Sequence, residues 1–394
     1  MTTFVSVEDV RAEAVVRMDT NTRNYYESGS MSQVRNANLI GRAAADNTLA
    51  HNSADFSRIL LRPRVLRDVS SVSLAACILG DHVSAPLAFA PSAMHGLVCQ
   101  DAEAATAKAA SKTGSLMVLS SYSNTSLEDV KSNCPHAPLW IQLYVHKDRS
   151  IAEGLMKRAE AAGYKAVVLT VDAPVLGRRL NDLRNKFTMP SHLKLANFSP
   201  EQGVASQSAR ISNPDSTYVK QAVNKGAVAD ASLSWKDISW IRSVTNMKIV
   251  LKGIMTPEDA VLACDWKVDA IVVSNHGGRQ LDTTPSTISV LPGIKAAVDA
   301  YYASGKSTST SGRIEIYMDG GIRCGTDILK ALALGANAVF IGRPVLWGLA
   351  VDGAAGVEKV VEILHDEMRN GMALLGVTQV DQLNPSCVQL KSLL

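Results

Sequence analysis

The sequence has few of the features that mark several large classes of protein. Its six cysteines, among 394 residues, are scattered and include no Cys-x-x-Cys pair. Neither a structural zinc site nor a disulfide framework is therefore expected, and an intracellular, reducing compartment is favoured. The net charge is only +3, and no basic run alternates with aromatic residues, so nucleic acid is not expected as a partner.

Long apolar runs and targeting signals are missing as well. No uncharged apolar stretch approaches the ~18 residues that span a bilayer, and no basic segment followed by an apolar one opens the chain as in a secretory signal. The last four residues, Lys391 to Leu394, do not match the Ser-Lys-Leu peroxisomal address. We expect a soluble, cytoplasmic protein that makes no membrane contact.

Apolar residues make up 46% of the chain, enough for a large core. Eight apolar runs alternate with helical patterns, which predicts a parallel α/β sheet, and the number eight favours a closed (β/α)8 TIM barrel. No Gly-x-Gly-x-x-Gly motif follows the first run, which argues against a dinucleotide-binding open sheet. The predicted strands are residues 87–90, 116–119, 140–143, 166–171, 249–251, 270–273, 314–318 and 338–341. Helical patterns include residues 101–113, 151–162, 257–264 and 326–334.

Two further regions complete a single predicted domain, residues 1–394, whose barrel covers about 85–375. The first ~85 residues read as a helical N-terminal extension, in which Ser6 and Asp9 form a capping pair. Residues 191–233 are polar and lack a sustained period, which is unusual for so long a connection. Because this connection would leave the carboxyl end of the fourth strand, we interpret it as a mobile lid. Residues 304–312 are predicted to be a solvated loop on the opposite face.

Polar or glycine residues follow every predicted strand at its carboxyl end, which is the end at which barrels build active sites. Residue types that are costly to bury thus recur at one rim, from strands far apart in sequence, and this predicts an active site there. In strand order they are Pro91, Ser92 and Ala93; Ser120 and Tyr122; Gln142 and Tyr144; Thr170 and Asp172; Lys252; Ser274 and His276; Asp319, Gly320 and Gly321; and Gly342 and Arg343.

Two of these groups suggest chemistry. His276 and Arg279 lie three residues apart and combine a base that titrates near neutral pH with a cation suited to gripping a carboxylate. This pair suggests proton abstraction from an organic acid, although a core histidine beside a surface arginine would also explain it. Residues 319–323 and 341–343 combine glycines with Arg323 and Arg343, which predicts a phosphate site after the last two strands.

Lys252 allows three interpretations. Its stem could simply pack along apolar surface. It could be a Schiff-base nucleophile, or a cation beside an electron-rich cofactor.

The sequence resembles the FMN-dependent 2-hydroxy-acid oxidase and dehydrogenase family, which includes glycolate oxidase and lactate oxidase. The signature Ser274-Asn275-His276-Gly277-Gly278-Arg279-Gln280 carries the resemblance most specifically. Residues 141–145, 169–174, 176–179 and 319–321 match too, and the likeness extends from about Tyr25 to Leu375. It implies one FMN hydroxy acid dehydrogenase domain, FMN as the cofactor and no metal.

The resemblance also implies individual roles. His276 would be the catalytic base, Asp172 would stabilise its protonated form, and Tyr144 would hydrogen-bond the substrate oxygen. Arg279 and Tyr25 would hold the substrate carboxylate, with Arg179 close by, and Lys252 would sit against the flavin N1–C2=O edge. The remaining cofactor contacts would be Pro91, Ser92, Ala93, Ser120, Gln142, Thr170, Ser274, Asp319, Gly320, Gly321, Arg323, Gly342 and Arg343.

The resemblance leaves the substrate and the electron acceptor open. Tyr122 stands where glycolate oxidases commonly have tryptophan, which favours L-lactate or a larger L-2-hydroxy acid. We expect O₂ as the acceptor, giving H₂O₂, and a homo-oligomer, either a tetramer or an octamer. The alternatives are a dehydrogenase that uses a quinone or protein acceptor, a Schiff-base lyase acting through Lys252, and a binding protein that has lost the chemistry.

Overall fold

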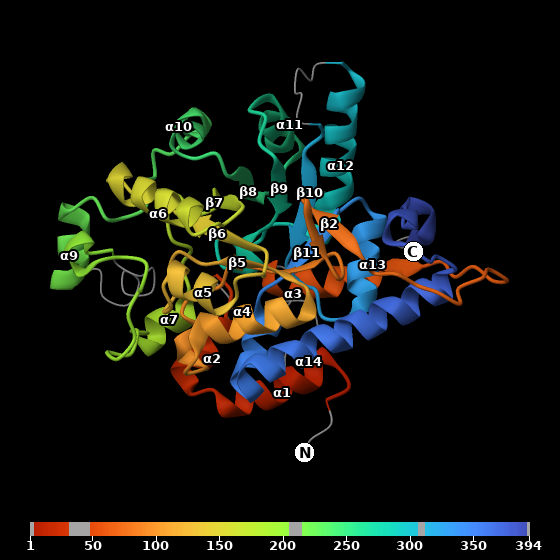
Figure 1. Ribbon diagram of the computed structural model, residues 1–394, viewed down its shortest axis with the longest axis horizontal. Helices are drawn as coiled ribbons and strands as arrows, with labels where there is room; N and C mark the ends of the chain where they lie inside the picture. Colours follow the sequence, from red (N-terminus) through yellow and green to blue (C-terminus); the bar gives the residue numbers. More distant parts are fainter. Residues whose placement is uncertain (1–3, 31–47, 205–214, 306–311, 392–394) are drawn as a thin grey trace.

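The computed structural model describes residues 4–30, 48–204, 215–305 and 312–391. Eight parallel strands close into a barrel, as predicted (Figure 1). They are β4 (Leu87–Phe89), β5 (Leu116–Leu119), β6 (Leu139–Leu143), β7 (Ala166–Thr170), β8 (Lys248–Ile254), β9 (Ala270–Val273), β10 (Glu315–Asp319) and β11 (Ala338–Ile341). The barrel closes where β11 pairs with β4, with Val339 beside Leu87.

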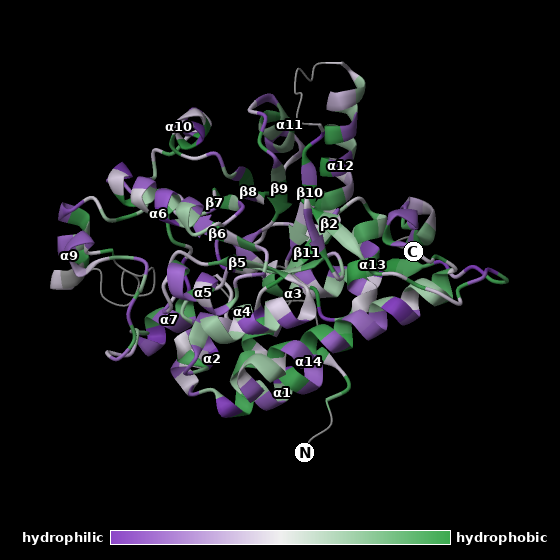
Figure 2. Cartoon of the chain, viewed as in Figure 1, coloured by the Kyte–Doolittle hydropathy of each residue, from purple (hydrophilic) through white to green (hydrophobic). Residues whose placement is uncertain are grey.

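Helices surround the barrel and cover its strands (Figure 1). They are α4 (Ala102–Thr113), α5 (Leu127–Asn133), α6 (Arg149–Ala161), α7 (Leu180–Asn185), α9 (Thr217–Asn224), α10 (Asp237–Val244), α11 (Pro257–Asp265), α12 (Thr287–Ala303), α13 (Gly325–Ala333) and α14 (Arg343–Leu375), with 3-10 turns η2 (His95–Leu97), η3 (Pro200–Gln202) and η4 (His276–Gly278). Hydrophobic and hydrophilic turns alternate along α14 in Figure 2, because one face of this helix lies in the core. Within the described ranges, no helix is both long and apolar enough to cross a membrane.

The inside of the barrel is filled by the side chains that alternate inward along each strand. Trp140, Tyr317 and Phe340 meet there, with ring centroids 5.3 to 6.1 Å apart. One layer of inward residues is thus mainly apolar: Ala88, Val118, Trp140, Val168, Val250, Val272, Tyr317 and Phe340. Two residues further along each strand, the inward positions hold Ala90, Ser120, Gln142, Thr170, Lys252, Ser274, Asp319 and Gly342. Because every second side chain of a strand points inward, the apolar layer inside the barrel is followed by a mostly polar layer at the carboxyl ends of the strands.

The N-terminal extension is helical at first: α1 (Val7–Arg17), α2 (Thr20–Glu27), α3 (Thr48–Ala54) and the turn η1 (Asp55–Arg58). The predicted capping pair is confirmed, since Ser6 and Asp9 form a reciprocal capping box at the start of α1. Helix α1 lies along α14 (Figure 1). This position brings α2, and with it Tyr25, to the rim of the barrel.

The extension also contains strands that were not predicted. β2 (Ala76–Ile78) and β3 (Asp81–Val83) form an antiparallel hairpin, and Asp81 accepts a hydrogen bond from the indole of Trp140 at 3.3 Å. Since Ile78 and Val83 pack with the inward barrel residues, this hairpin plugs the barrel end opposite the rim. β1 (Ile59–Leu61) pairs with β12 (Val388–Leu390), which follows the turns η5 (Val380–Gln382) and η6 (Pro385–Cys387) near the end of the chain.

The predicted lid is more ordered at its ends than its composition suggested. Residues 193–198, named here the stem, contact the barrel rim, and η3 and α9 are regular elements within the 191–233 range. Helix α9 was missed because few of the side chains whose burial is described in it are apolar and buried; Val219 and Ala222 are. Residues 205–214, the middle of the predicted lid, lie outside the described residues, as do residues 306–311 of the predicted solvated loop.

Candidate active site

A pocket opens at the carboxyl end of the barrel, where the polar strand ends converge. Its lining contains every predicted site residue except Asp172 and Ser274. The predicted residues that line it are Tyr25, Pro91, Ser92, Ala93, Ser120, Tyr122, Gln142, Tyr144, Thr170, Arg179, Lys252, His276, Arg279, Asp319, Gly320, Gly321, Arg323, Gly342 and Arg343. The structure thus brings together residues from all eight strand ends.

His276 and Asp172 form a hydrogen-bonded pair, with Nδ1 and Oδ1 2.8 Å apart. Burial lowers the pKa of His276 below its ordinary 6.5, although Asp172 acts in the opposite direction. Burial alone would raise the pKa of Asp172, but the charges of His276 and Lys252 outweigh it and lower that pKa. At neutral pH the pair is therefore a neutral imidazole held by a carboxylate, which is the state a general base needs.

Backbone geometry sets the orientation of this pair. His276 has φ 57°, and its N–H donates to the Ser274 hydroxyl at 3.1 Å. The neighbouring Asn275 exchanges two amide hydrogen bonds, of 2.7 and 2.8 Å, with Asn52 of α3. The N-terminal extension therefore fixes the loop that carries His276.

Gly253 gives Asp172 the space it needs. Its φ is 121°, and a Cβ on Gly253 would lie 2.6 Å from the Cβ of Asp172. Real Cβ atoms do not approach so closely, so the position of Asp172 beside β8 requires glycine here.

Lys252 is 4% exposed and points into the rim. Its Nζ donates to the Ser274 hydroxyl at 2.9 Å and lies 3.3 Å from Oδ2 of Asp319. Burial alone would lower the pKa of Lys252, but Asp319 and Asp172 outweigh it and raise that pKa. A Schiff-base nucleophile must be a neutral amine. The surroundings of Lys252 therefore favour a fixed cation over the lyase interpretation.

Ser274 lies behind the pocket surface. Its buried hydroxyl accepts hydrogen bonds from both Lys252 and the His276 backbone. It thus connects the base to the cation, while its predicted contact with a cofactor stays a prediction.

Four arginines gather around the pocket: Arg179, Arg279, Arg323 and Arg343. Burial and the neighbouring Arg279 lower the pKa of Arg179 to about 10. Burial, Arg279 and Arg323 lower the pKa of Arg343 to about 9. Buried cations that repel one another gain most from an anion, so the cluster fits anionic ligands.

Tyrosine rings line the pocket beside these arginines. Tyr25 stacks on Phe187 at 4.5 Å, and the Arg279 guanidinium lies over the Tyr25 ring at 4.8 Å. Nη1 of Arg279 also donates to the Tyr25 carbonyl. Tyr122 stacks on Tyr144, with their centroids 5.2 Å apart. Tyrosine phenols and an arginine fork thus face the same space as His276.

Sequence reasoning missed several residues at the site. Tyr26 lines the pocket, and its hydroxyl donates to the Met94 carbonyl at 2.8 Å, which holds the loop after β4. Met94 has φ 63° and lines the pocket too. Tyr26 follows Tyr25 directly, but nothing in its spacing indicates that it bonds a loop almost seventy residues away. The other lining residues missed include Ile322, Pro344 and Leu346.

A barrel whose rim holds a partly buried base, a buried lysine and an arginine cluster is typical of an enzyme that binds a phosphorylated cofactor and an organic acid. Comparison with known proteins agrees with this class. The model of the FMN-dependent dehydrogenase family matches residues 29–390, and the chain belongs to this family of FMN-dependent 2-hydroxy-acid oxidases.

Individual relatives cover nearly the whole chain. A 2-hydroxyacid oxidase of Dictyostelium discoideum is 44% identical over 388 residues, covering 98% of this chain and 90% of the relative. An L-lactate oxidase of Nostoc sp. is 45% identical over 363 residues, covering 91% and 94%. The solved structure of a mandelate oxidase with benzoyl-formic acid has a TM-score of 0.81 at 34% identity, covering 99% of this chain and 100% of the other.

FMN is the cofactor of the family, and the pocket fits it. Arg323 and Arg343 line the pocket beside Gly320, Gly321 and Gly342, and this cationic corner suits a phosphate. Oδ1 of Asp319 is buried and has no hydrogen-bond partner among the described residues, which suits a hydroxyl of a polyol chain. Gln142 and Thr170, joined by a 3.1 Å hydrogen bond, supply polar atoms for a heterocyclic ring.

Proposed function

We propose that this protein oxidises L-2-hydroxy acids to 2-keto acids and passes the electrons to O₂, which gives H₂O₂. L-Lactate or a larger L-2-hydroxy acid is the proposed substrate. The observation that carries the proposal is the partly buried His276, which Asp172 holds at 2.8 Å in a pocket lined by four arginines. Such a base next to an anion clamp suits the carbon that bears both a hydroxyl and a carboxylate.

Each residue has a proposed task. Arg279 and Tyr25 bind the substrate carboxylate, with Arg179 adding charge, and Tyr144 hydrogen-bonds the substrate oxygen. His276 takes a proton from the substrate, and Asp172 stabilises the imidazolium that forms. Bound FMN supplies the two-electron acceptor. Lys252 would hold a fixed positive charge against the bound flavin.

The proposed substrate rests on Tyr122. A tyrosine ring offers an apolar face to a methyl or longer group, and glycolate has no such group. One such contact changes specificity by about 10–200-fold. We therefore expect kcat/KM for L-lactate, or for a larger L-acid, to exceed that for glycolate by at least about tenfold, with the D-acids inert.

Anaerobic mixing followed by admission of air tests the proposal. L-Lactate or L-2-hydroxyoctanoate should bleach the flavin spectrum without oxygen, and air should restore it with one H₂O₂ formed per keto acid. Restoration only by a quinone or another acceptor would identify a dehydrogenase instead. A flavin that none of the acids bleaches would overturn the proposed reaction.

A further inference from the structure

Tyr122, which would contact the substrate side chain, is supported on two sides. Within the pocket it stacks on Tyr144. It also contacts Phe198 of the stem, with ring centroids 5.8 Å apart and ring planes inclined at 59°. Phe198 does not line the pocket. It therefore limits how far the Tyr122 ring can turn away from a substrate.

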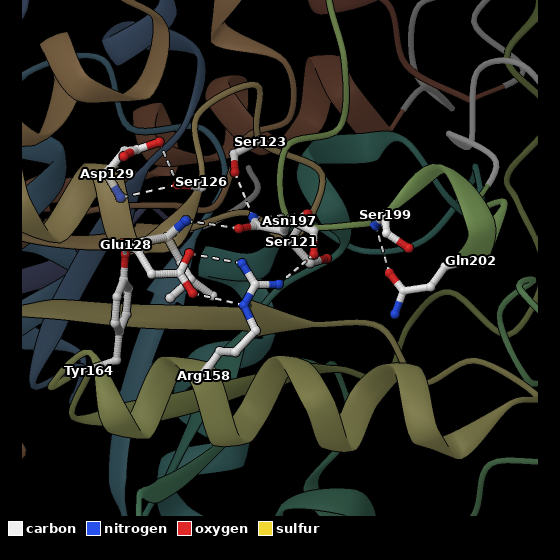
Figure 3. Close-up of polar contacts among 11 residues, drawn as sticks. Ser121, Ser123, Ser126, Glu128, Asp129, Arg158, Tyr164, Asn197, Ser199 and Gln202 are labelled. Atoms are coloured by element: carbon white, nitrogen blue, oxygen red, sulfur yellow. Dashed lines mark hydrogen bonds and ion pairs between the residues drawn. The ribbon is translucent and has the colours of Figure 1, made fainter.

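The neighbouring Asn197 connects the stem to the loop that carries Tyr122. Its side chain is buried, and its amide donates to the Ser121 carbonyl at 3.2 Å and to the Ser123 hydroxyl at 2.8 Å. Its amide oxygen accepts the Leu127 N–H at 2.9 Å. Figure 3 shows Asn197 reaching into this loop between β5 and α5. One side chain thus fixes both partners of the Tyr122–Phe198 contact.

A second set of bonds holds the stem from α6. Nη1 of Arg158 donates to the Asn197 carbonyl at 2.7 Å, and Nε and Nη2 each donate to Glu128 at 2.8 Å (Figure 3). Asn124 adds a bond to the Lys194 carbonyl at 2.9 Å. A guanidinium held by a bidentate carboxylate has little freedom to move. Arg158 therefore holds the stem in a fixed position beside the loop that carries Tyr122.

The same contacts extend to the cofactor side of the pocket. The Ser121 N–H and hydroxyl donate to Oε1 of Gln142 at 3.1 and 3.2 Å, and Nε2 of Gln142 donates to the Thr170 hydroxyl. Changing the stem could therefore disturb the flavin as well as the substrate. A useful test must separate the two effects.

We propose that Phe198, held by Asn197, is a positioning residue that sets which side-chain sizes on C2 of the substrate the enzyme accepts. This inference rests on the proposed function and deepens it. Removing the ring lets Tyr122 tilt outward, which enlarges the space for the substrate side chain. Larger acids gain from this change, whereas glycolate has no side chain there and is indifferent.

The test uses Phe198→Leu and anaerobic flavin reduction by glycolate, L-lactate and L-2-hydroxyoctanoate. The ratio of the reduction rate to the substrate Kd should rise about three- to tenfold for L-2-hydroxyoctanoate relative to L-lactate. The value for glycolate should change by less than about twofold.

Asn197→Asp provides a second, isosteric variant. It replaces the amide donor facing Ser121 and Ser123 with a carboxylate oxygen, so the stem should loosen and selectivity should shift in the same direction. Gln202→Ala is the matched control. The Gln202 side chain accepts the Ser199 N–H within the turn that follows the stem (Figure 3), and its loss should leave the substrate ratios unchanged.

The outcomes are separable. Equal changes for all three acids, or wild-type ratios in both stem variants, would overturn the inference and leave Phe198 a purely structural residue. If no acid reduces the flavin of the unaltered protein, the proposed function fails instead.

Discussion

At the scale of single residues, the charge state of His276 decides the pH dependence. Because burial lowers its pKa below 6.5, the neutral base persists into mildly acidic solution. Flavin reduction should therefore decline only as the pH falls through a value below 6.5.

The substitution Asp172→Asn tests whether His276 sets this pH dependence. Asp172 raises the pKa of His276, so removing its charge should move the acid limb of the profile to still lower pH. The plateau rate should fall by about 10²-fold or more, since the imidazolium loses its partner. Anaerobic stopped-flow across the acid range measures both effects. A limb displaced to higher pH would contradict the assigned pair.

Gly253 supports a second prediction. Gly253→Ala must push Asp172 away, since the new methyl carbon would lie 2.6 Å from its Cβ. A displacement of about 1 Å at a catalytic group costs about 10²-fold in rate. We expect flavin reduction to slow by that order while FMN stays bound. Gly154→Ala is the control, because nothing lies within 4 Å of the added methyl on α6.

At the scale of elements, Glu103 of α4 joins two loops of the site. Its buried carboxylate accepts the His95 N–H at 2.9 Å, and the Asn124 and Thr125 N–H groups at 3.0 Å. One of these loops carries Ala93 and the other carries Ser120 and Tyr122. The carboxylate therefore sets the spacing of two walls of the pocket.

Glu103→Gln should weaken FMN binding. An amide NH₂ would face at least one backbone N–H, and a hydrogen bond to a charged group is worth about 1.5–3 kcal/mol. Titration of the apoprotein with FMN should show at least about a tenfold higher Kd. Asp101→Ala is the control, because Asp101 is exposed and its side chain does not cap α4. This variant should leave the Kd for FMN unchanged. If its Kd rose as much as that of Glu103→Gln, the effect would be non-specific.

Sequence patterns predicted the elements that rest on local signals. The barrel strands are short apolar runs bounded by polar residues, and they fall within a few residues of the predicted ranges. The hairpin β2–β3 was missed because Cys77, Asp81 and His82 interrupt its apolar pattern. Site residues at strand ends were found for the same local reason. Glu103, Asn197 and Gly253 were not, because their roles depend on contacts with distant segments.

At the scale of the whole molecule, cofactor binding should stabilise the fold. A ligand present at a hundred times its Kd raises the free energy of unfolding by about 2.7 kcal/mol. Arg323 lowers the pKa of Arg343, and a phosphate bound at the proposed cationic corner would relieve the repulsion between these two arginines. Thermal unfolding should therefore shift upward much more with FMN than with riboflavin, which lacks the phosphate. Equal shifts would contradict the assigned phosphate corner. The oligomeric state, the compartment and the extent of the lid stay predictions.

The strand pair that closes the barrel has a consequence for biosynthesis. Leu87 of β4 cannot pair until Val339 of β11 has been synthesised, and ribosomes add about 5–20 residues per second. The edge of β4 thus stays unpaired for roughly 10–50 seconds in every nascent chain. Exposed apolar edges recruit other chains, so slower synthesis or chaperone shortage should lower the yield of folded protein even though the finished barrel has no open edge.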